Sequence, residues 1–394
     1  MRIGIDARFF GSIGKGLGRY TQKLIENLEK TDSENQYVIF LRKENFDEYR
    51  PKNKNFQKVL ADYRWYSFSE QLFFPKLLYK YKLDLMHFPH FNAPLLYRKK
   101  FVLTIHDLIL IHFPTVRSST LSPVFYWFKF LAYKIVIWSA VHRCKKIIAV
   151  SKFTKKDILN VYKDIPENKI EVTYEACENL YATGPDRSDE ILRKYGIIKP
   201  YLIYIGNVYP HKNPERLVLA FKKLEKIRGD IHPRTNENNA ASLADSKNIG
   251  VGVKLAFVGS EDYFYRRLKN FSAENEAKNV LFLEFVPDSD LGALLRSAEA
   301  YIRPSLYEGF ELPPLEAMSE GVPVLSSDHE CALEILGDSA LYFDGKNTDD
   351  MISAILKILS DGELRKRLIK KGYEQVKKYS WEKMARETLE IYKK

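Results

Sequence analysis

Short apolar runs alternate with amphipathic stretches along the whole chain of 394 residues. In the first half, the apolar runs predict strands at Arg2–Ile5, Tyr37–Leu41, Leu85–Phe88, Phe101–His106, Lys146–Val150 and Ile170–Tyr174. The stretches between them have the periodicity of helices, at Leu17–Lys30, Ser69–Tyr81, Ser122–His142 and Lys152–Tyr162.

The second half repeats this order of elements. Its apolar runs predict strands at Tyr201–Ile205, Lys254–Val258, Val280–Phe285, Ala300–Arg303, Val322–Ser326 and Ala340–Phe343. Its amphipathic stretches predict helices at Pro214–Ile227, Tyr263–Phe271, Ser289–Ala298, Pro314–Ser319, Asp349–Ser360 and Glu363–Lys378. The final segment, Tyr379–Lys394, predicts one more amphipathic helix.

Strands that alternate with helices in this way are typical of parallel sheets covered on both faces. Two such series predict an α/β protein of two Rossmann-like, doubly wound domains that face each other across a cleft. The polar stretch between Tyr181 and Lys199 is the expected boundary, which gives domains of residues 1–185 and 186–378. The segment Arg228–Gly252 has few large apolar residues, and we interpret it as a long mobile insertion.

The composition, with 45% hydrophobic and 29% charged residues, is typical of a globular protein and excludes a collagen-like or largely disordered chain. Charged residues at Arg2, Asp6 and Arg8 interrupt the N-terminus, so we expect no signal peptide. The three cysteines are far apart in sequence and fit no metal-binding spacing, which favours reduced thiols in the cytosol.

The positive charge is concentrated in the first half of the chain. Residues 1–180 contain 30 Lys and Arg against 18 Asp and Glu, whereas the remainder is nearly balanced. This asymmetry indicates a polyanionic partner, either nucleic acid or an anionic membrane. The alternative is a solvated basic face that aids solubility.

An apolar, aromatic segment at residues 122–146 lies within this basic half and is flanked by lysines. It could lie in the interface of an anionic membrane, but we favour packing in the core of the first domain. The basic and aromatic segment Tyr49–Arg64 could extend a membrane-facing surface.

The sequence RPSLYEGFELPPLEAMSEGVP, which begins at Arg303, carries the strongest chemical signal. A strand ends, a loop follows, and Pro313 and Pro314 open a short helix, where proline is favoured. The free backbone N–H groups at such a helix start attract phosphate. Two carboxylates, Glu308 and Glu316, are suited to accept hydrogen bonds from sugar or ribose hydroxyls. The alternative is an ordinary helix with acidic residues near its first turn.

Two further segments follow strands in the first half. The loop GSIGKGLGRY could cradle a phosphate, although Arg19 stands where the last glycine of a Rossmann fingerprint would be. His106 ends the strand VLTIHDL, and the carboxyl ends of parallel strands face the ligand crevice. His87 and His90 also follow a strand, and they fit either the acceptor side or simple loop packing.

EGFELPPLEA resembles the E-x7-E motif of retaining glycosyltransferases of family 4, which share the GT-B fold. The surrounding sequences AYIRPS, EGVPVLSS and LEILGDSALYFD agree, as does YIGNVYPHKNPERLVLAF at 204–221. GIDARFFGSIGKGLGRYTQKLIENL, TIHDL and IIAVSKFTKKDI also match, so the resemblance covers nearly the whole chain. It implies a donor-binding C-terminal domain, an acceptor-binding N-terminal domain, and a last helix, residues 379–394, that packs back on the first domain.

The resemblance also implies roles for residues at matching positions. Glu308 would bind the donor sugar, Glu316 the ribose, and Lys212 the diphosphate; His106, oriented by Asp107, would face the sugar. The implied catalytic residues are thus His106, Lys212 and Glu308. The implied donor-binding residues are Gly16, Asn207, Lys212, Gly309, Phe310, Glu311, Leu312 and Glu316. The implied acceptor-side residues are Gly14, Gly18, His90 and Asp107. Asn207 stands where many relatives have an arginine. The residue that would supply a second positive charge to the diphosphate is therefore open, with His211 and Arg216 as the candidates.

Among family members, the chain most resembles bacterial mannosyltransferases of polysaccharide or lipopolysaccharide synthesis. We therefore expect a retaining hexosyltransferase that needs no metal and uses GDP-mannose and a glycan or polyprenyl-linked acceptor. We expect it in the cytoplasm, peripheral at the inner face of the membrane. One alternative is a glucosyl- or N-acetylglucosaminyltransferase that uses a UDP- or ADP-sugar. A different class is a non-catalytic scaffold that binds membrane or nucleic acid; with no stacking or groove-reading motif, nucleic acid is not expected.

Overall fold

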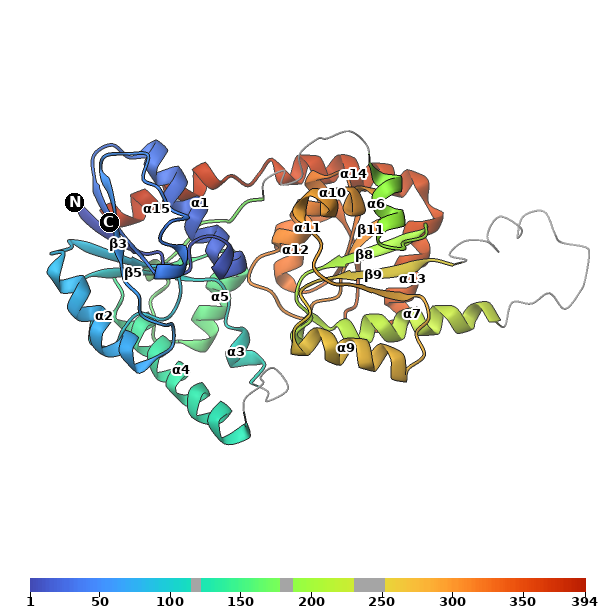
Figure 1. The fold of residues 1–394 in the computed structure, drawn as a ribbon, viewed down its shortest axis with the longest axis horizontal. Helices are drawn as coiled ribbons and strands as arrows, with labels where there is room; N and C mark the ends of the chain where they lie inside the picture. Colours follow the sequence, from blue (N-terminus) through green and yellow to red (C-terminus); the bar gives the residue numbers. More distant parts are fainter. Residues whose placement is uncertain (115–121, 178–186, 230–251) are drawn as a thin grey trace, which may run out of the picture. The chain divides into compact units, whose positions relative to one another are not determined.

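The computed structural model describes residues 1–114, 122–177, 187–229 and 252–394. The chain folds into two compact units, shown in Figure 1. The first comprises Met1–Ala176 together with Tyr379–Lys394, and the second comprises Cys177–Lys378. The boundary expected at residue 185 lies within 178–186, outside the described residues.

The first unit is built on a seven-stranded parallel sheet with the order β3-β2-β1-β4-β5-β6-β7. Its strands are β1 (Arg2–Asp6), β2 (Gln36–Leu41), β3 (Phe56–Leu60), β4 (Leu85–Phe88), β5 (Phe101–Ile105), β6 (Lys146–Ala149) and β7 (Ile170–Val172). Its helices are α1 (Lys15–Thr31), α2 (Phe68–Lys80), α3 (Ile109–His112), α4 (Pro123–Arg143), α5 (Lys152–Val161) and α15 (Trp381–Lys393).

The second unit is built on a six-stranded parallel sheet with the order β10-β9-β8-β11-β12-β13. Its strands are β8 (Tyr201–Ile205), β9 (Lys254–Val258), β10 (Val280–Leu283), β11 (Ala300–Arg303), β12 (Val324–Ser327) and β13 (Ala340–Phe343). Its helices are α6 (Ser188–Lys194), α7 (Pro214–Gly229), α9 (Tyr263–Glu274), α10 (Asp288–Ser297), α11 (Leu312–Ser319), α12 (Glu330–Leu336), α13 (Thr348–Ser360) and α14 (Gly362–Val376).

The central strands of both sheets are mostly apolar because helices cover both faces. Every residue of β5 and of β11 is buried. In each sheet the strand order reverses once, between β1 and β4 in the first unit and between β8 and β11 in the second. The loops that follow these strands diverge at the reversal, which is where open α/β sheets bind ligands. The predicted class, two doubly wound parallel-sheet units, is confirmed.

One prediction about the first unit is wrong, and one strand was not predicted. The membrane-facing role considered for segment Tyr49–Arg64 stays a prediction, but the segment contains the unpredicted edge strand β3, which pairs with β2 along Phe56–Leu60. Its sequence FQKVL carries Lys58 and Gln57 because an edge strand is half exposed, and this polarity hid it from the hydrophobic pattern. Helix α4, favoured as a core helix, buries one face of its C-terminal half and exposes most of its N-terminal half. The insertion expected at Arg228–Gly252 falls largely on residues 230–251, outside the described residues.

The C-terminal helix α15 belongs to the first unit and lies beside α1 (Figure 1). The side chain of Ser380 caps its N-terminus by accepting a hydrogen bond from the N–H of Lys383. Near its other end, the hydroxyl of Tyr392 lies 2.6 Å from Nδ1 of His87 on β4. His87 is completely buried, and burial lowers its pKa to about 3, so it is neutral. His87 is therefore an anchor for α15 and not a residue of an acceptor site.

Candidate active site

The loops after β8 and β11 meet at the carboxyl edge of the second sheet. Leu306 donates a backbone hydrogen bond of 2.8 Å to the carbonyl of His211, which joins the two loops. Asn213 has left-handed backbone geometry (φ 58°), and its Nδ2 donates to the carbonyls of Pro304 and Gly345 at 3.2 and 2.7 Å. One asparagine thus holds three loops in register around Glu308.

Glu308 is buried, and three donors converge on one of its carboxylate oxygens. Lys212 Nζ lies 2.9 Å, Arg303 Nη2 2.6 Å and Ser305 Oγ 2.8 Å from Glu308 Oε1. Burial alone would raise the pKa of Glu308, but the positive charges of Arg303 and Lys212 outweigh burial and hold the pKa well below its usual range. Glu308 is therefore a fully ionised, rigidly oriented carboxylate.

Arg303 is the cation that sequence reasoning missed. It is the last residue of β11, and its side chain is only 3% exposed, beneath Glu308. The sequence contained a signal, because an arginine at the end of an otherwise apolar, fully buried strand requires a carboxylate partner. Since the guanidinium is covered, Arg303 orients Glu308 and does not itself reach a donor.

The two alternatives considered for a second cation do not supply one. Burial lowers the pKa of His211 to about 4, so that this imidazole is neutral at pH 7. Arg216 donates from Nη1 to the backbone carbonyl of Lys346 at 2.6 Å, which engages it with the loop after β13. Asn207 is half-buried, and its backbone carbonyl accepts a hydrogen bond of 2.7 Å from the Tyr204 hydroxyl. Lys212, with its side chain 12% exposed, is the ammonium at this edge that a ligand can reach.

Glu311 immediately precedes helix α11 but does not cap it. Its carboxylate is fully buried and accepts a hydrogen bond of 2.8 Å from Nε2 of His329, while Nε of Arg303 lies 3.6 Å away. A ligand can therefore meet only the backbone of Glu311. Pro313 and Pro314 have no N–H groups, so the N–H donors at this helix start are those of Gly309, Phe310, Glu311 and Leu312. Glu316 lies one turn further along α11 and is 9% exposed.

The glycine-rich loop lies at the corresponding reversal of the first sheet, between β1 and α1. A Cβ atom at Gly14 would lie 2.1 Å from the carbonyl oxygen of Phe9, and one at Gly18 would lie 2.1 Å from that of Gly11. These glycines are required by the close packing of the loop on itself. A Cβ at Gly16 would meet no atom within 4 Å. Gly16 is thus exposed and not required by the packing of the loop, and its predicted role toward a ligand stays a prediction.

A buried charge network supports this loop. Arg8 is completely buried and pairs with Asp6 at 2.7 Å and with Glu70 of α2 at 2.6 Å. Asn92, which follows β4, donates a hydrogen bond of 2.7 Å to the same oxygen of Glu70. The network fixes the loops after β1 and β4 relative to each other, and it was not foreseen from the sequence.

His106 follows β5 and has an acceptor on each ring nitrogen. Nδ1 lies 2.8 Å from Glu175 Oε1, and Nε2 lies 2.9 Å from the carbonyl oxygen of Pro89. Burial opposes protonation, but the hydrogen bond and negative charge of Glu175 outweigh it and raise the pKa of His106. The orienting carboxylate is Glu175, a role that the sequence analysis gave to Asp107. Asp107 accepts a hydrogen bond of 3.0 Å from the N–H of Ile109 at the start of α3.

His90 lies near His106, with ring centres 6.4 Å apart, and packs edge-on against Phe9 of the glycine-rich loop. Burial and the charge of His106 lower the pKa of His90 to about 3. Nδ1 of His90 is buried and has no hydrogen-bond partner among the described residues. His90 thus presents a neutral ring at the first unit's candidate ligand edge.

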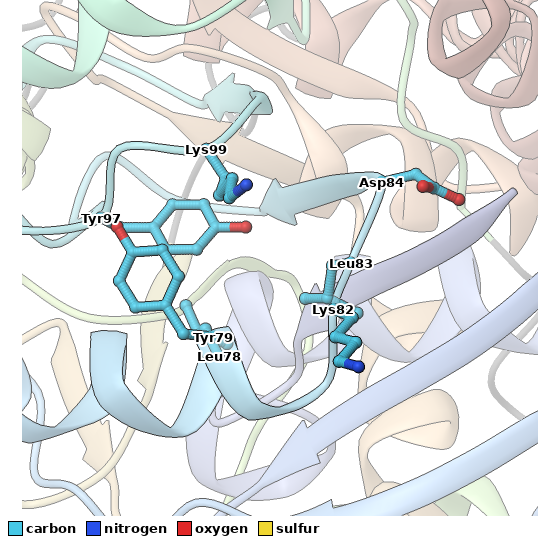
Figure 2. A pocket seen from close by; sticks show the side chains of 7 residues that line it. All are labelled: Leu78, Tyr79, Lys82, Leu83, Asp84, Tyr97 and Lys99. Carbon is cyan, nitrogen blue, oxygen red and sulfur yellow. The ribbon is translucent and has the colours of Figure 1, made fainter.

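A separate pocket of about 290 Å³ lies at the opposite edge of the first sheet (Figure 2). Lys82, Leu83 and Asp84 line it just before β4 begins, and Lys99 lines it before β5. Tyr79 and Tyr97 form its aromatic wall, with ring centres 5.5 Å apart. Because these residues precede the strands, the pocket is not part of the candidate active site.

Two sequence families match this chain. The family described as "Glycosyl transferases group 1" matches residues 188–375, and "Glycosyltransferase Family 4" matches residues 14–177. The chain is 28% identical over 396 residues to the O-antigen chain mannosyltransferase B of Escherichia coli, covering 96% of both proteins. It is 29% identical over 295 residues to the O-antigen chain mannosyltransferase RfbU of Salmonella typhimurium, covering 75% of this chain and 70% of that protein.

Solved structures share the fold. Sucrose-phosphate synthase from Thermosynechococcus elongatus superposes with a TM-score of 0.71 at 17% identity, covering 100% of this chain and 98% of that one. WaaG, a glycosyltransferase involved in lipopolysaccharide biosynthesis, superposes with a TM-score of 0.70 at 13% identity, covering 99% of both chains. The family matches and the two doubly wound units agree, so the chain is a GT-B hexosyltransferase that belongs to family 4 of the group 1 glycosyltransferases.

Proposed function

We propose that this enzyme transfers mannose from GDP-mannose, with retention of configuration, to a glycan or lipid-linked acceptor during cell-surface polysaccharide or lipopolysaccharide synthesis in the cytoplasm. Two similar relatives bear the name O-antigen chain mannosyltransferase, which supports both the sugar and the pathway class. The observation that carries the chemistry is the environment of Glu308, where three donors hold one carboxylate oxygen beside the accessible Lys212.

Glu308 in this environment binds the donor sugar and does not attack it. A carboxylate whose pKa is held far below its usual range is a weak nucleophile and a weak base. Its fixed orientation instead suits it to accept hydrogen bonds from sugar hydroxyls. Arg303 sets that orientation from below, and Ser305 supplies a neutral donor to the same oxygen.

The departing nucleoside diphosphate gains negative charge as the glycosidic bond breaks. Lys212 and the backbone N–H groups of Gly309 to Leu312 are placed to stabilise that charge. The leaving phosphate oxygen then accepts the proton of the attacking acceptor hydroxyl on the same face of the sugar. With this set of cationic and dipolar groups, the proposed reaction uses no bound metal. Glu316 binds the ribose.

His106 is the proposed positively charged group of the first unit. Both of its ring nitrogens already face acceptors, so the imidazolium acts by its charge and not by donating a hydrogen bond to the sugar. Gly16 lets the loop between β1 and α1 approach the ligand closely.

A donor panel with matched variants tests this function. Binding of GDP, UDP and ADP is measured by calorimetry, and release of nucleotide is measured from GDP-mannose, UDP-glucose, UDP-N-acetylglucosamine and ADP-glucose. We expect tight binding of GDP and turnover of GDP-mannose. Turnover confined to a UDP- or ADP-sugar would refute the donor but leave the family unchanged.

Lys212→Ala tests the role of the ammonium in the same assay. We expect a fall in turnover of about 100-fold or more, because one preorganised charge on the leaving group is removed. Lys278→Ala, which changes an exposed lysine of the same unit, is the matched control and is expected to keep full activity. Equal turnover in both variants would remove Lys212 from the phosphate site.

A further inference from the structure

Helix α4 carries a second apolar face that the described residues of its own unit leave exposed. We define the exposed face of α4 as Val124, Phe125, Trp127, Phe128, Leu131, Ile135 and Trp138. Their side chains are between 49% and 79% exposed. Trp127, Leu131, Ile135 and Trp138 follow one another at spacings of four, four and three residues, which aligns them in one stripe along the helix.

The opposite side of α4 is committed to the first unit. Ile137, Ala140 and Val141 are at most 1% exposed and join the hydrophobic core beneath the sheet. Arg143 donates from Nη1 to the carbonyl of Leu95 at 3.0 Å, which fixes the C-terminal end. Figure 1 shows the N-terminal end of α4 extending away from the sheet of this unit. The helix is long and apolar enough to cross a membrane, with 28% of its apolar window buried, but its packed side prevents it from doing so.

Basic residues predominate in the sequence segment that contains this face. Residues 108–156 contain nine Lys and Arg and no Asp or Glu. Lys129 and Lys134 are exposed on α4 itself, at the borders between its exposed and its packed sides. Long lysine side chains in that position extend their ammonium groups toward water while their stems cover apolar surface.

We propose that α4 lies flat in the interface of an anionic lipid bilayer, with its exposed face in the boundary between head groups and acyl chains. Aromatic side chains on one face and lysines at its edges are the pattern of helices that lie in a membrane surface. The net positive charge of residues 108–156 matches the negative charge of anionic phospholipids. A soluble protein partner would need an apolar groove surrounded by acidic groups. An anionic bilayer provides an apolar layer and negatively charged head groups over its whole surface.

Flotation of the full chain with lipid vesicles tests this surface without reference to catalysis, so its outcome is independent of the proposed function. We expect binding to vesicles of phosphatidylglycerol and phosphatidylethanolamine at 50 mM salt. We expect the bound fraction to fall several-fold at 500 mM salt, because the Debye length shortens, and also on pure phosphatidylcholine. The double variant Trp127→Glu/Leu131→Glu is expected to lower the affinity at least about tenfold, since it places charges in the apolar boundary.

Phe285→Glu is the matched control, because Phe285 is 78% exposed in the second unit. It is expected to bind vesicles like the wild type, and all variants are expected to keep the wild-type melting temperature. Two results would overturn the proposal. One is that the wild-type protein does not bind anionic vesicles at low salt, or that the Trp127→Glu/Leu131→Glu variant binds them as well as the wild type does. The other is a dimer in analytical ultracentrifugation that this double variant dissociates, which would assign the face to a second copy of the chain.

Discussion

Replacing Arg303 with methionine removes the cation beneath Glu308 and keeps a side chain of similar length. Glu308 then retains Lys212 at 2.9 Å and Ser305 at 2.8 Å, but it loses the buried guanidinium at 2.6 Å. Glu311 loses its cationic neighbour as well. We expect the pKa of Glu308 to rise and its carboxylate to lose its fixed orientation.

The magnitude follows from burial. Breaking a buried ion pair by removing one partner costs about 3–5 kcal/mol of unfolding free energy. Since Lys212 and Ser305 still pair with Glu308, we expect a smaller loss of about 2–3 kcal/mol, in the range of one hydrogen bond to a charged group. For a unit the size of Cys177–Lys378, this corresponds to a melting temperature lower by about 4–12 °C.

The assay is a double-mutant cycle of Arg303→Met, Glu308→Gln and the combined variant, measured by thermal and urea unfolding. The combined variant leaves no unpaired charge between these two positions. Its loss is therefore expected to fall short of the sum of the single losses by about 1–3 kcal/mol. Donor turnover is expected to fall in all three variants, because each one loses the oriented carboxylate.

The pH dependence provides a second readout. In the wild type the pKa of Glu308 is depressed, so its ion pairs contribute stability that is complete above its ordinary pKa of 4.5 and is lost progressively as the pH falls from there through the lower folded-state pKa. The stability difference between wild type and Arg303→Met should therefore shrink as the pH falls below 4.5. Additive losses in the cycle, or a constant difference between pH 7 and pH 3, would refute the role assigned to Arg303.

Three further predictions concern the supporting residues. Glu175→Gln is expected to lower the pKa of His106, which NMR of its ring protons can follow, and an unchanged pKa would contradict the pairing. Because the fold raises the pKa of His106, the contribution of this pair to wild-type stability is complete below pH 6.5 and is lost as the pH rises through the raised pKa. Gly16→Ala is expected to lower activity with little change in melting temperature. Gly14→Ala is expected to destabilise the first unit, because the new Cβ would lie 2.1 Å from the carbonyl oxygen of Phe9. Equal melting temperatures of the two variants would contradict this. Asn213→Gly keeps the left-handed backbone but removes two hydrogen bonds, so urea unfolding is expected to show a loss of about 1–3 kcal/mol, and a neutral result would show that the loops are held by other contacts.

The hydrophobic pattern predicted most of the fold because the central parallel strands are mostly apolar and the covering helices are amphipathic. It failed at β3, where an edge strand alternates with lysine and glutamine. It also failed at α4, because an apolar helix has the same sequence pattern whether its outer face meets protein, lipid or water. The short helices α6 and α12 were missed because seven residues are too few for a clear helical period.

The motif positions of the candidate site could be predicted, but their partners could not. Lys212 and Glu308 are 96 residues apart, His106 and Glu175 are 69 apart, and Asn213 and Gly345 are 132 apart. Which residues meet at a sheet edge depends on strand order, and local sequence does not encode strand order. Arg303, which was missed, is the one of these residues with a local signal, because a charge that ends a buried strand requires a partner nearby.

The position of α15 has a consequence for how the protein is made. The second unit is continuous in sequence, from Cys177 to Lys378, so it can complete its core while the chain is still attached to the ribosome. The first unit begins the chain but also needs its last residues, Tyr379–Lys394, to cover α1 and to reach His87. Its assembly therefore waits until Tyr379–Lys394 has been synthesised, after the whole of the second unit. A chain that stops before α15 leaves the first unit without the helix that packs on α1 and reaches His87.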